Sequence, residues 1–419
     1  MVINKNKFFY LVIFCLLFVE KTEAIFAINV FNPWDINLRP PIWCDTSFQI
    51  TGYDEFGLKA RGYNPDNDKV NVMQLWQPTQ DALAMIQSLP ATNPLRNILQ
   101  NIQDDGVRGH FTVTGKFDLN ASAGISARYH LPYNITISAH LPFYAMKLKN
   151  VLFQDLTLDD DSTENLLVRE NLTDNFLQVM EELDPSLDLT GWKRTGVGDF
   201  AVFAAWQGSY CQAKPILKNV DLTTRLGVTL PSGLRTNEDQ ILSIPFGYNG
   251  SAGLWFGAGI TLNWFDYIRG GLDFEFLHLF GNSRFQRIKI QRDQTDLLFL
   301  TKVYAHTDYG FTQQYNLYFE GYRFFHGLSA GMIYQFWRHG EDKLALFTNL
   351  YSDDIANTAE KLQEWTMHQV IFKLNYDFEC DLDACSKLKP NIFVFYKLPF
   401  NGTRAILVNT VGVAITLNF

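Results

Sequence analysis

The chain has 419 residues, a formal net charge of -9 and 47% hydrophobic residues, a length that would allow two or three soluble domains. Beyond about the first 20 residues it contains no apolar run long enough for a transmembrane helix, and we expect no nucleic-acid partner. Aromatic residues reach 15%, with 35 Phe and 18 Tyr, which suits the aromatic girdles of membrane barrels. An aromatic-rich soluble β-protein has the same composition, so the elements along the chain must decide.

The N-terminus has the three-part layout of a secretory signal peptide. Two lysines precede an unbroken apolar run over residues 8–19, and a Thr-Glu-Ala sequence ends at Ala24. The run is too short to span a bilayer comfortably. We therefore expect residues 1–24 to be removed on export, with cleavage after Ala27 as the alternative.

Residues 25–45 precede the first strand and contain three prolines and no alternation. Such a segment either trails in the periplasm or enters the lumen of a barrel as a small plug. Its apolar content, with Trp34 and Trp43, favours the plug. The barrel itself is expected over residues 46–419.

The stretch KFDLNASAGISARYHL, residues 116–131, alternates between apolar and small or polar residues, a period that no helix gives. We expect strands at 46–60, 111–131 and 134–148. A sandwich could also alternate. However, the polar positions carry Gly, Ser, Asn and scattered charges, whereas a sandwich surface would be richer in Lys and Glu, so they favour a barrel lumen.

Two long connections differ from the strands in their sequence patterns. Residues 70–104 show apolar residues at helical spacing after Pro78, and a second short helix follows Pro94. This helical loop either covers the barrel mouth, which we favour, or forms part of a groove for a lipophilic ligand. The loop at 149–196 is acidic around residues 159–161. It either binds cations that bridge lipopolysaccharide or, as we favour, is a solvated outer loop.

Eleven further alternating stretches bring the expected total to fourteen strands, with twelve to sixteen as the range. They lie at 197–209, 217–230, 251–264, 267–280, 294–307, 314–325, 328–339, 343–351, 364–378, 388–400 and 405–419. Long and short connections alternate along the chain, as in outer-membrane barrels. The short FFHG and FNGT connections are exceptions, because this count makes both of them outer loops.

The last ten residues, TVGVAITLNF, alternate and end on Phe419. A closing strand that pairs with the first strand needs no polar tail, and an aromatic end resembles the signal read by the outer-membrane assembly machinery. A bilayer admits only closed hydrogen-bonded structures. The sequence therefore predicts an all-β, transmembrane antiparallel barrel in the bacterial outer membrane, with lipid, lipopolysaccharide and that machinery as partners.

Four cysteines remain after the expected cleavage, and an oxidising compartment permits disulfides between them. We favour Cys380 with Cys385, which would clip a short loop. Cys44 with Cys211 is then left by subtraction. The partners of a tetrahedral zinc site are missing, and we expect neither a metal nor a cofactor.

The sequence contains no G-x-S-x-G, no H-E-x-x-H and no Gly-rich phosphate loop. We therefore expect no enzyme and no catalytic residues. Charged and histidine side chains at the polar positions are candidates to line the lumen. They are Arg128, His130, His140, Asp273, Glu275, Glu320, Lys373 and Asp377.

Three stretches carry a family resemblance: residues 127–144, a strand–turn–strand ending in Leu-Pro-aromatic, and the G-x-G-D and G-x-x-x-P-x-G motifs at 196–206 and 222–233. Over roughly residues 115–265 the chain resembles FadL-like long-chain fatty-acid transporters, especially the related barrels associated with phenol degradation. The resemblance implies fourteen strands, an N-terminal lumen plug and passive uptake of hydrophobic compounds. The chain departs from it in its short pre-barrel segment and in its helical loop after the first strand.

These observations favour a passive channel or transporter, for small lipophilic molecules. A surface structural or adhesion barrel that displays its outer loops is the second hypothesis. An outer-membrane enzyme with a working lumen histidine is the third.

Overall fold

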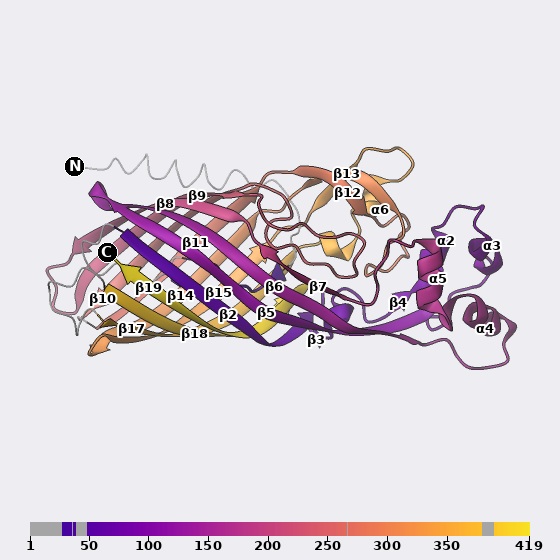
Figure 1. The fold of residues 1–419 in the computed structure, drawn as a ribbon, viewed down its shortest axis with the longest axis horizontal. Coiled ribbons are helices and arrows are strands. Elements are labelled where there is room, and N and C mark those ends of the chain that lie inside the picture. The colour runs from indigo at the N-terminus through magenta and orange to yellow at the C-terminus, as the bar shows by residue number, and fades with distance from the viewer. Residues whose placement is uncertain (1–26, 36, 39–47, 266, 379–388) are drawn as a thin grey trace.

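The computed structural model describes residues 27–419 except 36, 39–47, 266 and 379–388. Twelve long strands of the described chain close into an antiparallel barrel (Figure 1). They are β2 (Phe48–Tyr63), β5 (His110–Leu131), β6 (Ile135–Asp155), β8 (Phe200–Cys211), β9 (Leu217–Leu230), β10 (Gly253–Trp264), β11 (Ile268–Leu279), β14 (Thr312–Phe325), β15 (Leu328–His339), β17 (Trp365–Asp377), β18 (Lys389–Thr403) and β19 (Ala405–Asn418). The prediction of a closed antiparallel all-β barrel is confirmed.

The first and last strands close the barrel. β19 pairs with β2 from Ala405 opposite Tyr63 to Asn418 opposite Gln49. The Phe419 amide then donates a 2.9 Å hydrogen bond to the Phe48 carbonyl. The alternating final residues therefore form the strand that closes the barrel, as predicted.

Apart from the short connection between β18 and β19, short and long connections lie at opposite ends of the barrel (Figure 1). The short-turn end carries η2 (Pro132–Asn134) between β5 and β6 and the tight connections β8–β9, β10–β11 and β14–β15. The long-loop end carries the helices, with the small elements that accompany them. These are η1 (Val72–Gln74), α2 (Ala82–Gln87), α3 (Pro94–Leu99), α4 (Thr163–Val168), the π-helical turn η3 (Arg169–Thr173), α5 (Phe176–Leu183), α6 (Asp353–Ala356), η4 (Glu360–Leu362), β3 (Lys69–Val70), β4 (Gln80–Asp81) and β7 (Trp192–Val197).

The expected count of fourteen strands is corrected to twelve in the described chain. β12 (Asn282–Arg287), β13 (Lys302–Asp308) and β16 (Lys343–Leu346) form a separate three-stranded sheet at the long-loop end. The predicted strands at 294–307 and 343–351 are therefore not barrel wall. Their alternation is real over β13, where one face is covered, but seven residues cannot span a bilayer that needs about 9–11. Without them, the FFHG connection falls at the short-turn end, which removes one exception.

β5 and β6 are 22 and 21 residues long and extend beyond their neighbours at the long-loop end. Their pairing shifts register between Leu119 and Ala121. Such a bulge turns the following side chains to the other face. Ser122 and Ser126 are buried on one side of the bulge, whereas Phe117 and Leu119 are buried on the other side within an apolar cluster.

That cluster is a core built by the outer loops. Met73, Leu83 and Ile86 of the helical loop pack in it with Phe176 and Met180 of α5. The Asp81 carboxylate accepts the Ala84 amide at 3.0 Å and so caps α2. The loops at the long-loop end thus share one apolar interior.

A single guanidinium joins three of these loops. Arg287 Nη2 lies 2.7 Å from Asp184 Oδ2 and 2.6 Å from Asp239 Oδ1. Partial burial acts to raise the pKa of Asp184. Hydrogen bonds from Ser186 and Arg287 outweigh this effect and hold that pKa below its usual value. The pKa of Asp239 is likewise lowered against partial burial by Lys302 and Arg287.

We expect Arg287→Met to lower the free energy of local unfolding of the outer loops by about 2–3 kcal/mol, since two carboxylates lose their hydrogen-bonded partner. Limited trypsin digestion should then cleave residues 156–191 faster, while the barrel keeps its resistance to unfolding in SDS. Arg292→Met is the matched control, because Arg292 is exposed. Equal cleavage rates in the two variants would show that Arg287 does not hold the loops.

Candidate functional site

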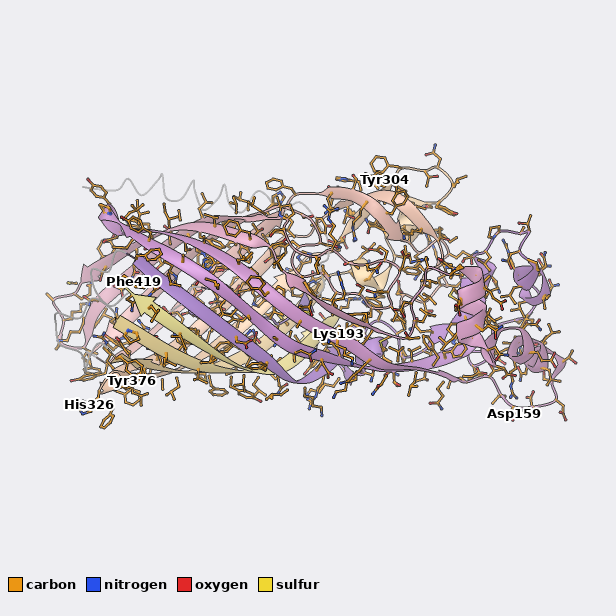
Figure 2. All side chains as sticks on the ribbon, in the orientation of Figure 1. Asp159, Lys193, Tyr304, His326, Tyr376 and Phe419 are labelled. Carbon is orange, nitrogen blue, oxygen red and sulfur yellow. The ribbon has the colours of Figure 1, made fainter. Side chains whose placement is uncertain are left out.

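The outward face of the barrel is apolar. Most strands expose large aliphatic or aromatic side chains on it, and Figure 2 shows this outer layer. Examples are Ile125, Ile137, Leu226, Ile260, Leu272, Leu317, Met332, Leu374, Val394 and Ile415. A continuous apolar surface of this kind is unstable in water and suits lipid. Among the described residues, no helix has the length and hydropathy to cross a membrane.

The inward face is polar and densely paired. Arg225 of β9 pairs with Glu275 of β11, and Arg269 Nη2 lies 2.7 Å from Glu320 Oε2. A closed wall with lipid-compatible residues outside and buried ion pairs inside is the architecture that a bilayer requires. The chain is an outer-membrane β-barrel.

The predicted lumen residues occupy this inner face with one partial exception. Arg128, His140, Asp273, Glu275, Glu320, Lys373 and Asp377 are buried. His130 is half-buried at the short-turn end, where Nδ1 lies 3.1 Å from Thr136 Oγ1. Arg128 Nη1 donates to Gln49 at 2.9 Å, and Asn316 donates to Asp273 at 2.8 Å. These residues lie on several strands and do not form one cluster.

The N-terminal segment, described over residues 27–38 except 36, packs against buried residues of the barrel wall. β1 (Ala27–Ile28) pairs in parallel with Ala405 and Ile406 of β19. Asn29 continues this pairing with its side chain, because its amide donates to the Val408 carbonyl at 2.8 Å and accepts the Val408 N–H at 2.7 Å.

A buried ion pair holds the same segment to the wall. Lys397 Nζ lies 2.8 Å from Glu55 Oε1, and both side chains are at most 1% exposed. Lys397 also donates to the Asn29 carbonyl at 3.2 Å, and Glu55 Oε2 accepts the Phe31 amide at 2.7 Å. Sequence reasoning missed this pair, since Glu55 and Lys397 come from opposite ends of the barrel sequence.

Further along, Asp35 accepts two side-chain amides, from Gln314 at 2.5 Å and from Gln335 at 2.6 Å. Phe31 stacks on Phe395 with ring centroids 4.9 Å apart. The ring centroids of Trp34 and Trp255 are 6.0 Å apart. The segment is thus held by contacts from several parts of the wall. Trp43 lies outside the described residues.

Next to Trp34 the barrel encloses an aromatic chamber of about 90 Å³. It lies between the N-terminal segment, the wall and the connection from β9 to β10. Its aromatic lining consists of Trp34, Tyr144, Phe246, Tyr248, Trp337 and Trp365. We call this cavity the aromatic chamber.

The two sequence motifs meet at this chamber. Asp199 of the G-x-G-D motif accepts the amide of Gly233, the last residue of the G-x-x-x-P-x-G motif, at 2.8 Å and that of Tyr248 at 2.5 Å. A Cβ on Gly247 would collide with the same carboxylate. The motifs therefore position the loop that lines one side of the aromatic chamber.

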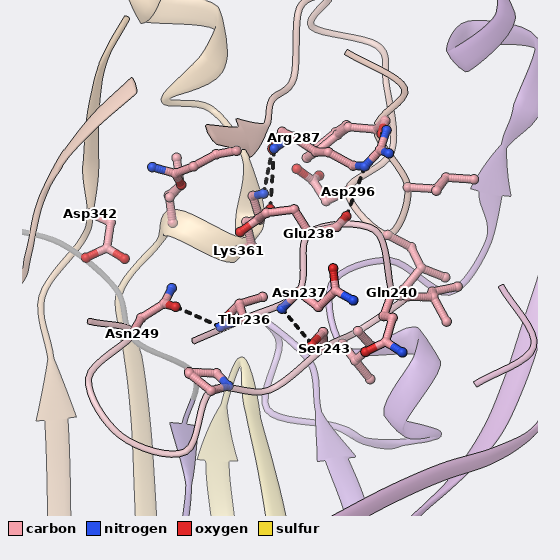
Figure 3. A pocket seen from close by; sticks show the side chains of 18 of the residues that line it. Thr236, Asn237, Glu238, Gln240, Ser243, Asn249, Arg287, Asp296, Asp342 and Lys361 are labelled. Atoms are coloured by element: carbon pink, nitrogen blue, oxygen red, sulfur yellow. Dashed lines mark hydrogen bonds between the residues drawn. The ribbon is translucent and has the colours of Figure 1, made fainter. Parts of the chain in front are cut away.

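A second cavity, of about 120 Å³, lies on the outer side of that loop (Figure 3). Polar and charged side chains line it, among them Glu238, Arg287 and Lys361, and burial lowers the pKa of Lys361. Pro245 lines both cavities. The loop around Pro245 thus separates this polar outer vestibule from the aromatic chamber.

Other predicted sites have simpler outcomes. Cys211 is exposed and has no disulfide partner among the described residues. Cys44, Cys380 and Cys385 lie outside them, so both predicted pairings remain predictions.

In the outer loops His110 Nε2 lies 3.0 Å from Asp104 Oδ1 and 3.7 Å from Asp81 Oδ2. These ligand atoms are close enough to share a metal ion. A hydrogen bond between the imidazole and the Asp104 carboxylate explains the same spacing, and we assign no metal to it.

No protein-family model matches the chain, and no curated protein sequence matches it. Among solved structures, an outer-membrane channel of Pseudomonas putida F1 aligns with 93% of this chain and 100% of its own, at 12% identity and a TM-score of 0.48. The toluene transporter TodX of Pseudomonas putida aligns over 95% of both chains at 9% identity and a TM-score of 0.36. A FadL homologue of Pseudomonas aeruginosa aligns over 90% of both chains, at 9% identity and a TM-score of 0.29. Such barrels are what the chain is similar to.

Proposed function

We propose that this barrel is a passive channel or transporter for small hydrophobic compounds. The observation that carries the proposal is the aromatic chamber, which lies inside the lumen and is lined by six aromatic side chains. Ligand sites are typically concave and mostly apolar, with a few polar groups that fix orientation. A compound that leaves the outer vestibule would meet this chamber next.

A general porin is disfavoured by the lumen itself. The described residues 27–38 cross it and make hydrogen bonds to the wall through Asn29, Phe31 and Asp35. An adhesion barrel would need outer loops that are free to engage a partner. Here the apolar residues of those loops pack into one core instead.

An enzyme is disfavoured by the separation of the lumen candidates. His140 contacts Trp34, Phe203 and Ser138, with its Nε2 3.0 Å from Ser138 Oγ. A general base must lie within hydrogen-bond reach of a reacting group. Ser138 is within that reach of His140, but the rings of Trp34 and Phe203 pack against the imidazole. We therefore propose no catalytic role for this histidine.

Filling the aromatic chamber tests the proposal. Met367 lines it and is buried. We expect Met367→Trp to slow ethylbenzene uptake by intact cells about tenfold, because overpacking costs on the order of 1–3 kcal/mol. Met332→Trp is the matched control, since Met332 is half exposed on the lipid face of β15. A wide, freely ion-conducting pore in planar bilayers, or equal uptake by both variants, would favour a general porin.

A further inference from the structure

We propose that the aromatic chamber selects neutral apolar molecules that carry a hydrogen-bond acceptor, such as an aromatic ketone or ester, over hydrocarbons of the same size. The inference rests on the proposed transport function and specifies its substrate class. It is carried by four buried indole groups whose N–H donors have no acceptor among the described residues.

The four tryptophans come from separate parts of the barrel. Trp34 lies in the N-terminal segment, and Trp255, Trp337 and Trp365 lie on β10, β15 and β17. Their exposed fractions are 3%, 1%, 7% and 5%. All four belong to one apolar cluster, and three of them, Trp34, Trp337 and Trp365, line the aromatic chamber.

None of the four Nε1 atoms has a hydrogen-bond partner within the described part of the chain. An indole N–H can only donate, and a buried tryptophan usually finds an acceptor. Trp192, in the outer-loop core, shows the usual case, because its Nε1 donates to the Ile241 carbonyl at 2.9 Å. A group of four donors without acceptors therefore distinguishes this cluster.

Several other polar groups beside the chamber are already engaged. Asn29 donates to Gln369 at 3.1 Å, Gln369 donates to Gln335 at 2.5 Å, and Gln335 donates to Asp35 at 2.6 Å. This chain of side chains pairs its own donors with its own acceptors. The indole N–H groups stand beside these engaged side chains as donors, and the complementary ligand for them brings an acceptor.

The charges at the chamber favour a neutral ligand. Asp199 contributes a carboxyl group to its lining, and none of the described lining residues is lysine or arginine. An anionic acceptor such as a carboxylate would therefore lack a counter-charge. A carbonyl, ester or ether oxygen satisfies an indole N–H without that penalty.

The chamber is smaller than its ligand. Its volume of about 90 Å³ compares with the roughly 150 Å³ of an engineered cavity that binds benzene. A substituted benzene therefore fits only when side chains of the wall move. That movement brings the indole N–H groups into contact with the ligand. A site with unpaired buried donors then discriminates against an analogue that lacks the acceptor.

Acetophenone and ethylbenzene form the test pair, because they match in size and differ at one carbonyl. We expect the full-length protein in detergent to bind acetophenone about tenfold more tightly, although ethylbenzene is the more hydrophobic. With ¹⁵N-labelled tryptophan, the indole N–H resonances of Trp337 and Trp365 should shift with acetophenone and not with ethylbenzene. Trp337→Phe and Trp365→Phe, which keep an aromatic ring, should each reduce the preference severalfold.

Trp206→Phe is the control, since Trp206 lies partly exposed on β8, and it should leave the preference unchanged. Equal binding of the two compounds, or a preference that neither Phe variant alters, would overturn the acceptor rule while leaving hydrophobic transport intact. Binding of neither compound would overturn the transport proposal as well.

Discussion

Deleting residues 27–38 is expected to turn the occluded barrel into an open ion-conducting pore. The described part of this segment is bonded to β19 through Ala27, Ile28 and Asn29 and fills the lumen with Phe31 and Trp34. Without it, the inner face consists of ion pairs and amides that water can solvate. Single-channel conductance in planar bilayers should rise roughly tenfold or more.

A deletion within residues 159–183 provides the comparison. That segment contains α4 and α5, which lie at the long-loop end and away from the lumen (Figure 1). Its removal should leave conductance near the value of the intact chain. If the deletion of residues 27–38 also leaves conductance unchanged while the barrel remains folded, then another part of the chain closes the lumen.

The second large effect is expected at the Glu55–Lys397 pair. Lys397→Met should lower the free energy of unfolding by about 3–5 kcal/mol, because it leaves a buried carboxylate without its counter-charge. Urea titration of the barrel in lipid vesicles, followed by electrophoretic mobility, measures this loss. The same variant removes the hydrogen bond to the Asn29 carbonyl, so conductance should also rise.

The double variant Glu55→Gln with Lys397→Met separates charge from packing. It removes both charges, so most of the lost stability should return. Thr410, whose hydroxyl donates to Glu55, keeps an acceptor in the glutamine carbonyl oxygen. A double variant as unstable as Lys397→Met would mean that the contact of the Lys397 ammonium group with the rings of Phe31 and Phe395 dominates instead.

Local alternation in the sequence predicts the wall well. The strand expected at 251–264 is β10 at Gly253–Trp264, and that at 267–280 is β11 at Ile268–Leu279. These strands expose one apolar face to lipid, so the period of two is complete. Alternation predicts less in β13, because any sheet with one covered face produces it whether or not the strand crosses a membrane.

Local alternation does not predict which side chains of different strands contact each other. Asp273 and Glu275 were expected to line the lumen, but the partner of Glu275 was not identified. The register places Arg225 and Glu275 opposite the same residue, Gly257, on the two sides of β10. Because Gly257 has no side chain, the two charged groups meet across it. Only the pairing of three strands reveals this.

The motifs show the same limit. The G-x-G-D and G-x-x-x-P-x-G sequences marked a resemblance without indicating their task. In the structure Asp199 and Gly233 hydrogen-bond to each other and fix the loop that carries Phe246 and Tyr248. Trp255, Trp337 and Trp365 escaped sequence reasoning for a related reason, since they lie on three strands that are far apart in the sequence.

The parallel pairing of residues 27–28 with β19 bears on the order in which the barrel forms. Asn29 is bonded to Val408 of the last strand, and that strand also completes the wall by pairing with β2. Residues 27–29 and β2 therefore both need β19, the last strand of the chain, before they can form these hydrogen bonds. If the ring seals before residues 27–31 are inside, they must thread in afterwards through the end that carries the tight turns. Maturation of this protein would then have a slow final step whose rate depends on the N-terminal segment and not on the wall.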